Sequence, residues 1–429
     1  MNLLKRVKSN SLYKTGLSYS LVSSCKSFAT MGVGILIMRW LQPSELGLWN
    51  AVSIFQAYVP FFQFGIQSGL NRDLPILLGE KNNVKAEELV ANAKGFAYIL
   101  SIVFILLGFL LSSFFYLLGK EISFIAGIFT VAIMAASMSL QLHLVATFRS
   151  ARAFDRLTRV YIIDTILIFL LVYFIYKYHY YGILIYNSIT YIVSASLMAY
   201  YAPYKHIRPQ IRKKPLVYLG KVGLVLMSFI QLRGIAQSIP RWIILSVGGV
   251  VKLGLFSPAM AINGVMNMLP NQIAQFFHPQ MGFKYGTSGC ARDLWPYVKK
   301  IVLWYPLLTL PICICIWILA PWLLNTFFPK YIESLWPMRI MALGFVFSGA
   351  FTTHGILYTI KAYKPAYLYS FIELVGYFIW PYLVICIFHI DALVSVCIGL
   401  AFNQVLLYVL NICILKKVLF FPCYNLNKD

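Results

Sequence analysis

The sequence predicts an all-α polytopic membrane protein with about twelve transmembrane helices in two six-helix bundles around a central cavity. Three observations predict this fold. The 429 residues are 60% hydrophobic and only 11% charged, about half the charged fraction of a soluble protein. Apolar stretches of about 20 residues, each long enough to cross a bilayer, recur along the whole chain. Landmarks in the first half of the chain recur in the second.

The apolar stretches predict twelve spans. In the first half we expect them near residues 12–38, 46–68, 95–118, 122–147, 158–176 and 181–202. In the second half we expect them near 217–247, 254–276, 298–324, 335–358, 366–388 and 392–414. The basic N-terminus precedes a long apolar run without a clear cleavage site, so the first span is interpreted as uncleaved.

Lys and Arg in the loops orient these spans. One side of the membrane would carry 27 of these residues and the other side 5, and Lys26, Arg233, Arg241 and Arg339 are the remaining four of the 36. Because cytoplasmic loops are enriched in Lys and Arg, both termini are predicted to be cytoplasmic. The formal net charge of +23 then reflects basic loops and an anionic cargo, and no nucleic-acid partner is expected.

Two anchors indicate that the halves are repeats. "LGLW" (46–49) matches "LGLF" (253–256) at an offset of 207 residues, and "RAFDRLTRVYIID" (152–164) resembles "KAYKPAYLYSFIE" (361–373) at an offset of 209. We therefore expect an N-terminal bundle at 1–203, a basic cytoplasmic linker at 204–216 and a C-terminal bundle at 217–429. Six helices per half make the repeats parallel, with the cargo bound between the bundles and moved by alternating access.

The repeat relates two charges in otherwise apolar helices. An offset of 207 residues places Lys26 of the first helix on Arg233 of the seventh. A charge near the bilayer centre costs roughly 2.5–3.5 kcal/mol on insertion scales, and a water-filled cavity removes most of that cost. Because neither helix carries an acidic residue nearby, the cargo is expected to supply the counter-charge. Pairing with backbone carbonyls or a distant acid is the structural alternative.

Further polar residues are weaker candidates, each with a structural alternative. Arg241, Arg339 and Arg72 could serve the cationic cavity, but the first two also suit interface anchors and Arg72 could pair with Asp73. Asp164 and Glu373 are expected at the starts of helices five and eleven, where simple salt bridges are favoured over proton coupling. The remaining candidates, better explained as satisfied polar residues or helix–helix contacts, are His143, His354, Gln231 and Gln237.

No catalytic constellation, metal-site spacing or cofactor motif is apparent in the sequence, so a non-enzymatic protein without metal or cofactor is predicted. The short loops leave little room for the site of a glycosyltransferase or polymerase.

Three segments resemble a known family. "RWLQPSELGLWNAV" (39–52) and "GLNRDLP" (69–75) are similar to the second-helix pattern of polysaccharide transporters. "VVKLGLFSPAMAING" (250–264) resembles the family's helix-eight pattern, with Phe256 where Tyr is usual. The chain thus resembles the O-antigen and capsule flippases of the multidrug/oligosaccharidyl-lipid/polysaccharide (MOP) superfamily, which also contains the MATE drug exporters.

The resemblance implies translocation of an undecaprenyl-pyrophosphate-linked oligosaccharide from the cytoplasmic to the periplasmic leaflet of the bacterial inner membrane. It implies membrane lipid, a polysaccharide polymerase and chain-length machinery as partners. Two other classes stay open: a MATE-like drug or cation antiporter, which would normally have an acidic cavity, and a non-transporting membrane scaffold, which would need no buried cations.

Overall fold

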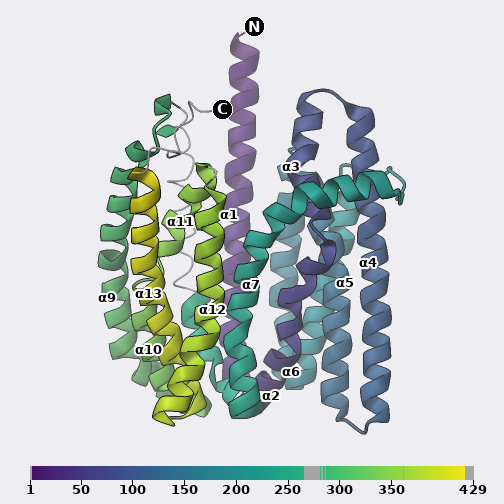
Figure 1. The fold of residues 1–429 in the computed structure, drawn as a ribbon. Helices are drawn as coiled ribbons and strands as arrows, with labels where there is room; N and C mark the ends of the chain where they lie inside the picture. Colours follow the sequence, from purple (N-terminus) through teal and green to yellow (C-terminus); the bar gives the residue numbers. More distant parts are fainter. Residues whose placement is uncertain (1, 265–280, 282–283, 286, 361, 421–429) are drawn as a thin grey trace. The chain divides into compact units, whose positions relative to one another are not determined.

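The computed structural model describes residues 2–264, 281, 284–285, 287–360 and 362–420. Helices make up the secondary structure of this part of the chain, which contains no β-strand (Figure 1). Eight of the described helices are long and apolar enough to cross a membrane. The elements are α1 (Asn2–Trp40), α2 (Pro43–Ser53), η1 (Ile54–Gln63), α3 (Ile66–Gly79), α4 (Asn83–Leu117), α5 (Ile122–Ser150), α6 (Phe154–Tyr201), α7 (Lys213–Leu255), η2 (Ala291–Leu294), α9 (Trp295–Phe327), η3 (Pro329–Ser334), α10 (Leu335–Phe345), α11 (Ala350–Thr359), α12 (Tyr363–Phe388) and α13 (Ala392–Phe420).

Helices occupy the predicted spans, and the breaks between spans have local causes. The continuous assignment of α6 hides a sharp break at His179, whose φ of 49° and ψ of −117° separate predicted spans five and six. Gly249, with a φ of 74°, likewise interrupts α7 where the eighth span was expected to begin, a conformation that glycine adopts readily. The predicted second span is a composite of α2, η1 and α3. Residues 265–276 of the predicted eighth span lie outside the described residues.

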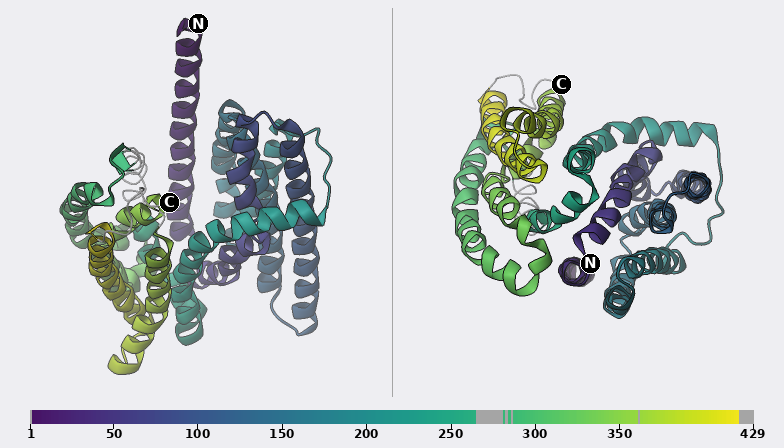
Figure 2. Two further views of the ribbon diagram at one scale, coloured as in Figure 1. Left: turned by 45° about the horizontal axis from the view of Figure 1, so that its top comes forward. Right: turned by 90° about the horizontal axis from the view of Figure 1, so that it is seen from below.

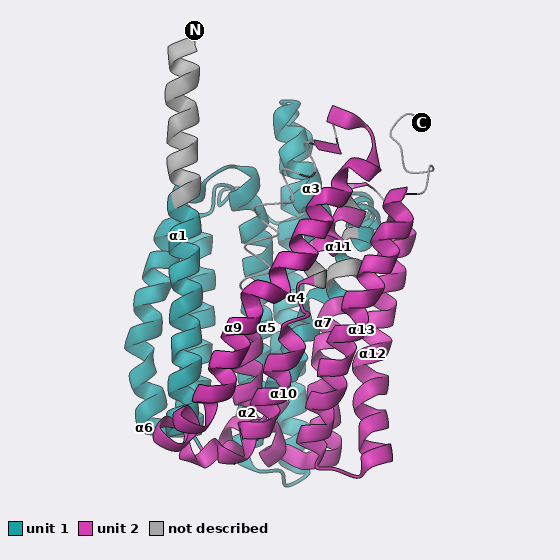
Figure 3. Ribbon diagram, turned by 90° about the vertical axis from the view of Figure 1, so that its left-hand side faces the viewer, with its two compact units in different colours: residues 1–41, 52–231 teal, residues 42–51, 232–429 magenta. Residues whose placement is uncertain are grey.

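The chain forms two compact units (Figure 3). Unit 1 comprises residues 1–41 and 52–231, and unit 2 comprises residues 42–51 and 232–429. The units therefore differ from the halves of the sequence in two segments, since 42–51 belongs to unit 2 and 217–231 to unit 1. In each of the two segments, or directly beside it, a glycine packs closely against the backbone of the unit that the segment joins. In unit 1, a Cβ on Gly223 would lie 1.8 Å from the carbonyl oxygen of Gly65, and in unit 2 one on Gly254 would lie 1.7 Å from that of Pro43.

Unit 1 is held together by antiparallel helices that contact through small residues. Helices α4 and α5 lie side by side, α5 packs on α6, and α6 on α1 (Figure 2). A Cβ on Gly108 of α4 would lie 2.2 Å from that of Ala132 in α5, and Ser101 of α4 donates a hydrogen bond to the Ala136 carbonyl at 2.8 Å. Such close approach is typical of membrane helices, where lipid leaves little hydrophobic force between them.

Unit 2 is built around α13, which contacts α12 and α10. Again small residues permit the approach: Gly399 of α13 lies against Pro381 of α12, and Gly344 of α10 against Ala401 of α13. This packing places polar residues of α12 and α13 inside the bundle, where Asn403 and Asn411 are 0% and 1% exposed.

Two repeat-related segments contact each other within unit 2. Gly47 and Gly254, which are 207 residues apart, meet where α2 crosses the chain at 250–254, and each would place a Cβ 3.0 Å from the backbone nitrogen of the other. One turn later, the Asn50 side-chain amide donates a 2.8 Å hydrogen bond to the Ser257 hydroxyl, again across 207 residues. The "LGLWN" and "LGLFS" motifs of the sequence repeat are therefore direct neighbours.

Candidate functional site

An ion pair lies inside unit 1. Lys26 of α1 and Asp164 of α6 approach to 2.6 Å between Nζ and Oδ2, and the Asp164 side chain is fully buried. Ser194, from the second part of α6, donates a 2.8 Å hydrogen bond to the same carboxylate oxygen. The break at His179 reverses the direction of α6 and so allows Ser194 and Asp164 to meet. The charge of Lys26 is thus compensated by a carboxylate from another helix.

Tyr161 completes the surroundings of Lys26. It precedes Asp164 by three residues, a spacing that places both side chains on one face of α6. The Lys26 Nζ lies 4.6 Å from the centroid of the Tyr161 ring, within cation–π range. The ring of Tyr19 packs on that of Tyr161, with centroids 5.7 Å apart. A quarter of the Lys26 side chain remains exposed.

A second ion pair lies inside unit 2. Arg233 of α7 and Glu373 of α12 approach to 3.8 Å between Nε and Oε1, and their side chains are 23% and 7% exposed. This distance satisfies an ion pair but exceeds that of a hydrogen bond. The two pairs are related by the sequence repeat, since Lys26 corresponds to Arg233 and Asp164 to Glu373.

Two expectations from the sequence are therefore wrong. Asp164 and Glu373 do not lie at the edges of their helices but are buried within α6 and α12. The cargo was expected to supply the counter-charge of Lys26 and Arg233, but Asp164 and Glu373 supply it instead. Neither helix that carries a cation also carries a nearby acid, and both counter-charges come from another helix, α6 for Lys26 and α12 for Arg233.

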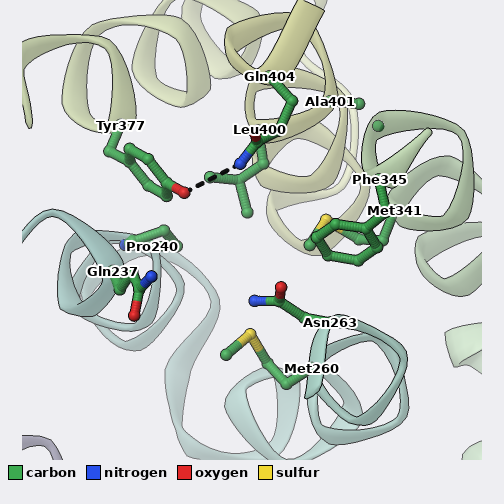
Figure 4. A pocket seen from close by; sticks show the side chains of 11 residues that line it. Gln237, Pro240, Met260, Asn263, Met341, Phe345, Tyr377, Leu400, Ala401 and Gln404 are labelled. Carbon is green, nitrogen blue, oxygen red and sulfur yellow. Dashed lines mark hydrogen bonds between the residues drawn. The ribbon is translucent and has the colours of Figure 1, made fainter. Parts of the chain in front are cut away.

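A polar pocket adjoins the second pair. All the residues that line it have side chains able to form hydrogen bonds, and they come from five segments of unit 2. They are Arg233, Gln237, Asn263, Ser348, Tyr369, Glu373, Tyr377 and Gln404. The Gln404 amide donates a 3.1 Å hydrogen bond to the Tyr377 hydroxyl (Figure 4). In this conformation the pocket has room for little more than a water molecule.

An apolar pocket continues from the polar one through shared residues. Gln237, Asn263, Tyr377 and Gln404 line both, and Figure 4 shows them facing the side chains of Met260 and Phe345 among others. The interior of unit 2 thus combines one ion pair, several amides and hydroxyls, and an apolar wall. These side chains combine one cationic group with several hydrogen-bond donors and acceptors.

The two candidate histidines are buried in matching helices. His143 of α5 lies with Nδ1 3.3 Å from the Gln67 side-chain oxygen, so in unit 1 it is a hydrogen-bonded core residue. His354 of α11 stacks on Tyr369 with ring centroids 4.3 Å apart, and Tyr369 lines the polar pocket of unit 2. Only the second histidine therefore lies next to the candidate site of its unit.

The remaining sequence candidates do not join either ion pair. Arg72 approaches Asp73 to 3.8 Å, as the local alternative predicted. Arg339 donates to the Trp317 carbonyl at 3.1 Å and lies over the rings of Trp317 and Trp336, which makes it an aromatic anchor of unit 2. Arg241 is half-buried in α7.

The two glutamines differ in their surroundings: Gln231 is buried and belongs to unit 1, whereas Gln237 lines the pockets of unit 2.

Comparison with known families shows to which family the chain belongs. A family model described as "Polysaccharide biosynthesis protein" matches residues 36–337, more than half of the sequence. The chain belongs to this family. Comparison with curated proteins gives no match.

Solved structures share the fold of this polysaccharide biosynthesis protein. An inward-facing multidrug resistance MATE family transporter of the MOP superfamily matches with a TM-score of 0.74 and 14% identity, over 92% of this chain and 95% of that one. A MOP superfamily transporter from Pyrococcus furiosus matches with a TM-score of 0.61 and 14% identity, over 95% of each chain. The protein is therefore a multi-pass membrane protein whose fold resembles that of these MOP superfamily transporters.

Several polar residues beside the two ion pairs are not among the candidates predicted from the sequence. Ser194, Asn263, Tyr377 and Gln404 are isolated polar residues in apolar helices, which was the available signal. Polar side chains are expensive in lipid and usually face the interior of a bundle. The sequence did not show which of many such residues meet the ion pairs, because that depends on contacts between distant helices.

Proposed function

We propose that this member of the polysaccharide biosynthesis family is a flippase for an undecaprenyl-pyrophosphate-linked oligosaccharide, such as an O-antigen or capsule repeat unit. The observation that carries the proposal is Arg233 beside a pocket of amides and hydroxyls deep in an apolar bundle. A guanidinium suits a pyrophosphate, and amide and hydroxyl groups suit the hydroxyls of sugars.

Binding of the pyrophosphate would require exchange of partners. Arg233 is paired with Glu373, so an incoming anion competes with that carboxylate for the guanidinium. The 3.8 Å separation makes this exchange less costly than at the 2.6 Å contact of Lys26 with Asp164. The pocket would also have to widen to admit a glycan, as expected in alternating access.

In this proposal the protein lies in the bacterial inner membrane with both termini in the cytoplasm. Translocation then moves an anion out of an inside-negative cell, which is favourable by about 2.3 kcal/mol per charge per 100 mV. The bundles predicted at 1–203 and 217–429 would move relative to each other, and the polymerase and chain-length machinery would receive the translocated unit.

Deletion and complementation in the native host tests the proposal. Restoring the wild-type chain is expected to restore surface polysaccharide, whereas Arg233→Ala at equal protein level should reduce it more than tenfold, because truncating one partner of a charged contact costs about 2 kcal/mol or more. Arg233→Lys should retain more polymer. Arg208→Ala, an exposed basic residue of the linker, serves as the control. Wild-type levels of polymer in the deletion strain or in Arg233→Ala would refute the proposal.

A second candidate, a MATE-like drug or cation antiporter, gains support from one structural observation. Asp164 and Glu373 lie inside their bundles, where a carboxylate could exchange a proton for a cationic substrate. Proteoliposomes with an internal pH dye separate the two candidates. Proton movement driven by added organic cations would favour the antiporter, and its absence together with restored polymer would favour the flippase.

A further inference from the structure

A large surface pocket lies where the two ends of α6 meet. Because the chain reverses at His179, the first turns of α6 and the residues that follow its C-terminal end are neighbours. The pocket has a volume of about 610 Å³ and belongs entirely to unit 1. Its lining consists of Asp155, Arg156, Arg159, Tyr200, Tyr201, Ala202, Pro203, Lys205 and His206. Neither Lys26 nor Arg233 is among these residues.

Basic side chains dominate this pocket. Arg156, Arg159 and Lys205 are all exposed, and none of them forms an ion pair with a described residue. The Lys205 Nζ lies 5.6 Å from the centroid of the Tyr200 ring, so the pocket also presents an aromatic surface. Asp155 is the single carboxylate of the lining. The charge balance therefore favours an anion.

An apolar stripe continues from the pocket along the same helix face. Ile162, Ile163, Ile166 and Leu170 follow Arg159 at helical spacing, and each of them is exposed. An exposed apolar face on a helix long enough to cross a membrane suits contact with lipid chains. The stripe and the pocket together match an amphiphile, with an anionic head among the arginines and a hydrocarbon chain along the isoleucines.

We propose that this pocket binds the phosphate headgroup of an anionic phospholipid. The planar guanidinium groups of Arg156 and Arg159 suit phosphate oxygens, and basic pockets at the cytoplasmic side of membrane helices commonly bind anionic lipid headgroups. The assignment to the cytoplasmic leaflet depends on the orientation proposed above, whereas binding itself does not depend on the transported substrate. A free phosphate would use the arginines but not the apolar stripe.

Lipid binding to the purified full-length chain tests the proposal. Native mass spectrometry in a neutral detergent would follow titration with phosphatidylglycerol and, in parallel, with phosphatidylcholine of the same acyl chains. Wild-type protein should prefer phosphatidylglycerol. The variant Arg156→Gln/Arg159→Gln/Lys205→Gln should lose at least roughly tenfold in affinity for it and little for phosphatidylcholine.

A matched control removes the same charge elsewhere on the basic side of the chain. Arg208, Lys213 and Lys214 are exposed and do not line the pocket, so their triple change to Gln should leave phosphatidylglycerol binding within about twofold of wild type. Equal losses in the two triple variants would show a non-specific charge effect and overturn the proposal.

Two further measurements test the role of charge and separate a lipid from a free phosphate as the ligand. Arg156→Lys/Arg159→Lys keeps the charges but not the planar guanidinium groups, so it should retain more binding than the Gln variant and less than wild type. Binding as weak as that of the Gln variant would contradict an electrostatic headgroup site. Soluble glycerol phosphate should displace the lipid only at concentrations at least roughly tenfold higher, because it lacks the chains that contact the stripe. Displacement at equal concentration would overturn the lipid assignment. These measurements do not use polymer synthesis, so they can fail independently of the flippase proposal.

Discussion

The two units hold ion pairs at repeat-related positions, but the pairs differ in how tightly they are held. In unit 1 Lys26 lies 2.6 Å from Asp164, and Ser194 adds a hydrogen bond to the same oxygen. In unit 2 Arg233 lies 3.8 Å from Glu373 beside a polar pocket. We therefore expect a division of roles: the first pair stabilises its bundle, whereas the second exchanges its partner for a ligand, as the proposed function requires.

One substitution between the repeats accounts for part of this difference. An offset of 209 residues relates Ser194 to Asn403 of α13. Asn403 is fully buried, yet neither its Oδ1 nor its Nδ2 makes a hydrogen bond with a described residue. Glu373 therefore lacks the donor that Asp164 receives from Ser194. The unit 2 site contains polar groups that a ligand or water could engage.

The largest expected effect comes from breaking the tight pair. Lys26→Met leaves the fully buried Asp164 carboxylate without its cation, which should lower the free energy of unfolding by about 3–5 kcal/mol. Thermal or denaturant unfolding in detergent measures the loss. The double variant Lys26→Met/Asp164→Leu removes both charges and should recover most of it. Equal stability of Lys26→Met and wild type would show that the unit 1 pair is not structural.

Glycine contacts should affect the two units equally, in contrast to the ion pairs. Gly223→Ala in unit 1 and Gly254→Ala in unit 2 each push a Cβ into a backbone carbonyl and should destabilise by about 1–3 kcal/mol. Gly264→Ala is the control, because its Cβ would meet no atom of a described residue within 4 Å. The same unfolding measurement applies. If only one of the first two variants is destabilised, the packing in the two units is less alike than described.

Breaking the looser pair should affect stability less and ligand binding more. Arg233→Met is expected to lower the free energy of unfolding by about 1–2 kcal/mol, less than Lys26→Met, while abolishing most surface polysaccharide. Unfolding of the purified variant and polymer measured in cells give the two readouts. A stability loss as large as that of Lys26→Met would contradict the division of roles.

The smallest expected effect concerns an ion pair of unit 2 between Lys252, in the last turn of α7, and Asp391, the residue before α13. Partial burial alone would raise the pKa of Asp391, but hydrogen bonds from Lys252 and the Leu393 backbone hold it below its ordinary value. A carboxyl with a lowered folded-state pKa contributes stability above its unfolded pKa and loses it as the pH falls through the folded value. This exposed pair should contribute at most about 1 kcal/mol.

Asp391→Asn should therefore flatten part of the acid side of the stability profile below about pH 4, with little change at neutral pH. Unfolding measured between about pH 3 and pH 7 provides the test. An unchanged acid-side slope in Asp391→Asn would show that the pair does not contribute to stability.

The sequence predicted the fold better than the site, and the reason is the range of the interactions involved. Spans follow from local composition, so breaks near His179 and Gly249 appear where apolar runs are interrupted. The repeat correctly related Lys26 to Arg233 and Asp164 to Glu373 as two matched sets. The repeat could not show that each cation contacts an acid, because Lys26 and Asp164, like Arg233 and Glu373, are about 140 positions apart in the sequence. The exchange of residues 42–51 between units has the same cause.

The meeting of Gly47 with Gly254, and of Asn50 with Ser257, has a consequence for the origin of the molecule. The contact between the two glycines is reciprocal, with each Cβ position 3.0 Å from the backbone nitrogen of the other, as in the two-fold interface of a symmetric dimer. A half-length ancestor could therefore have formed this contact between two identical subunits. Fusion of the two genes would have preserved the contact while freeing each copy of the ion pair to diverge.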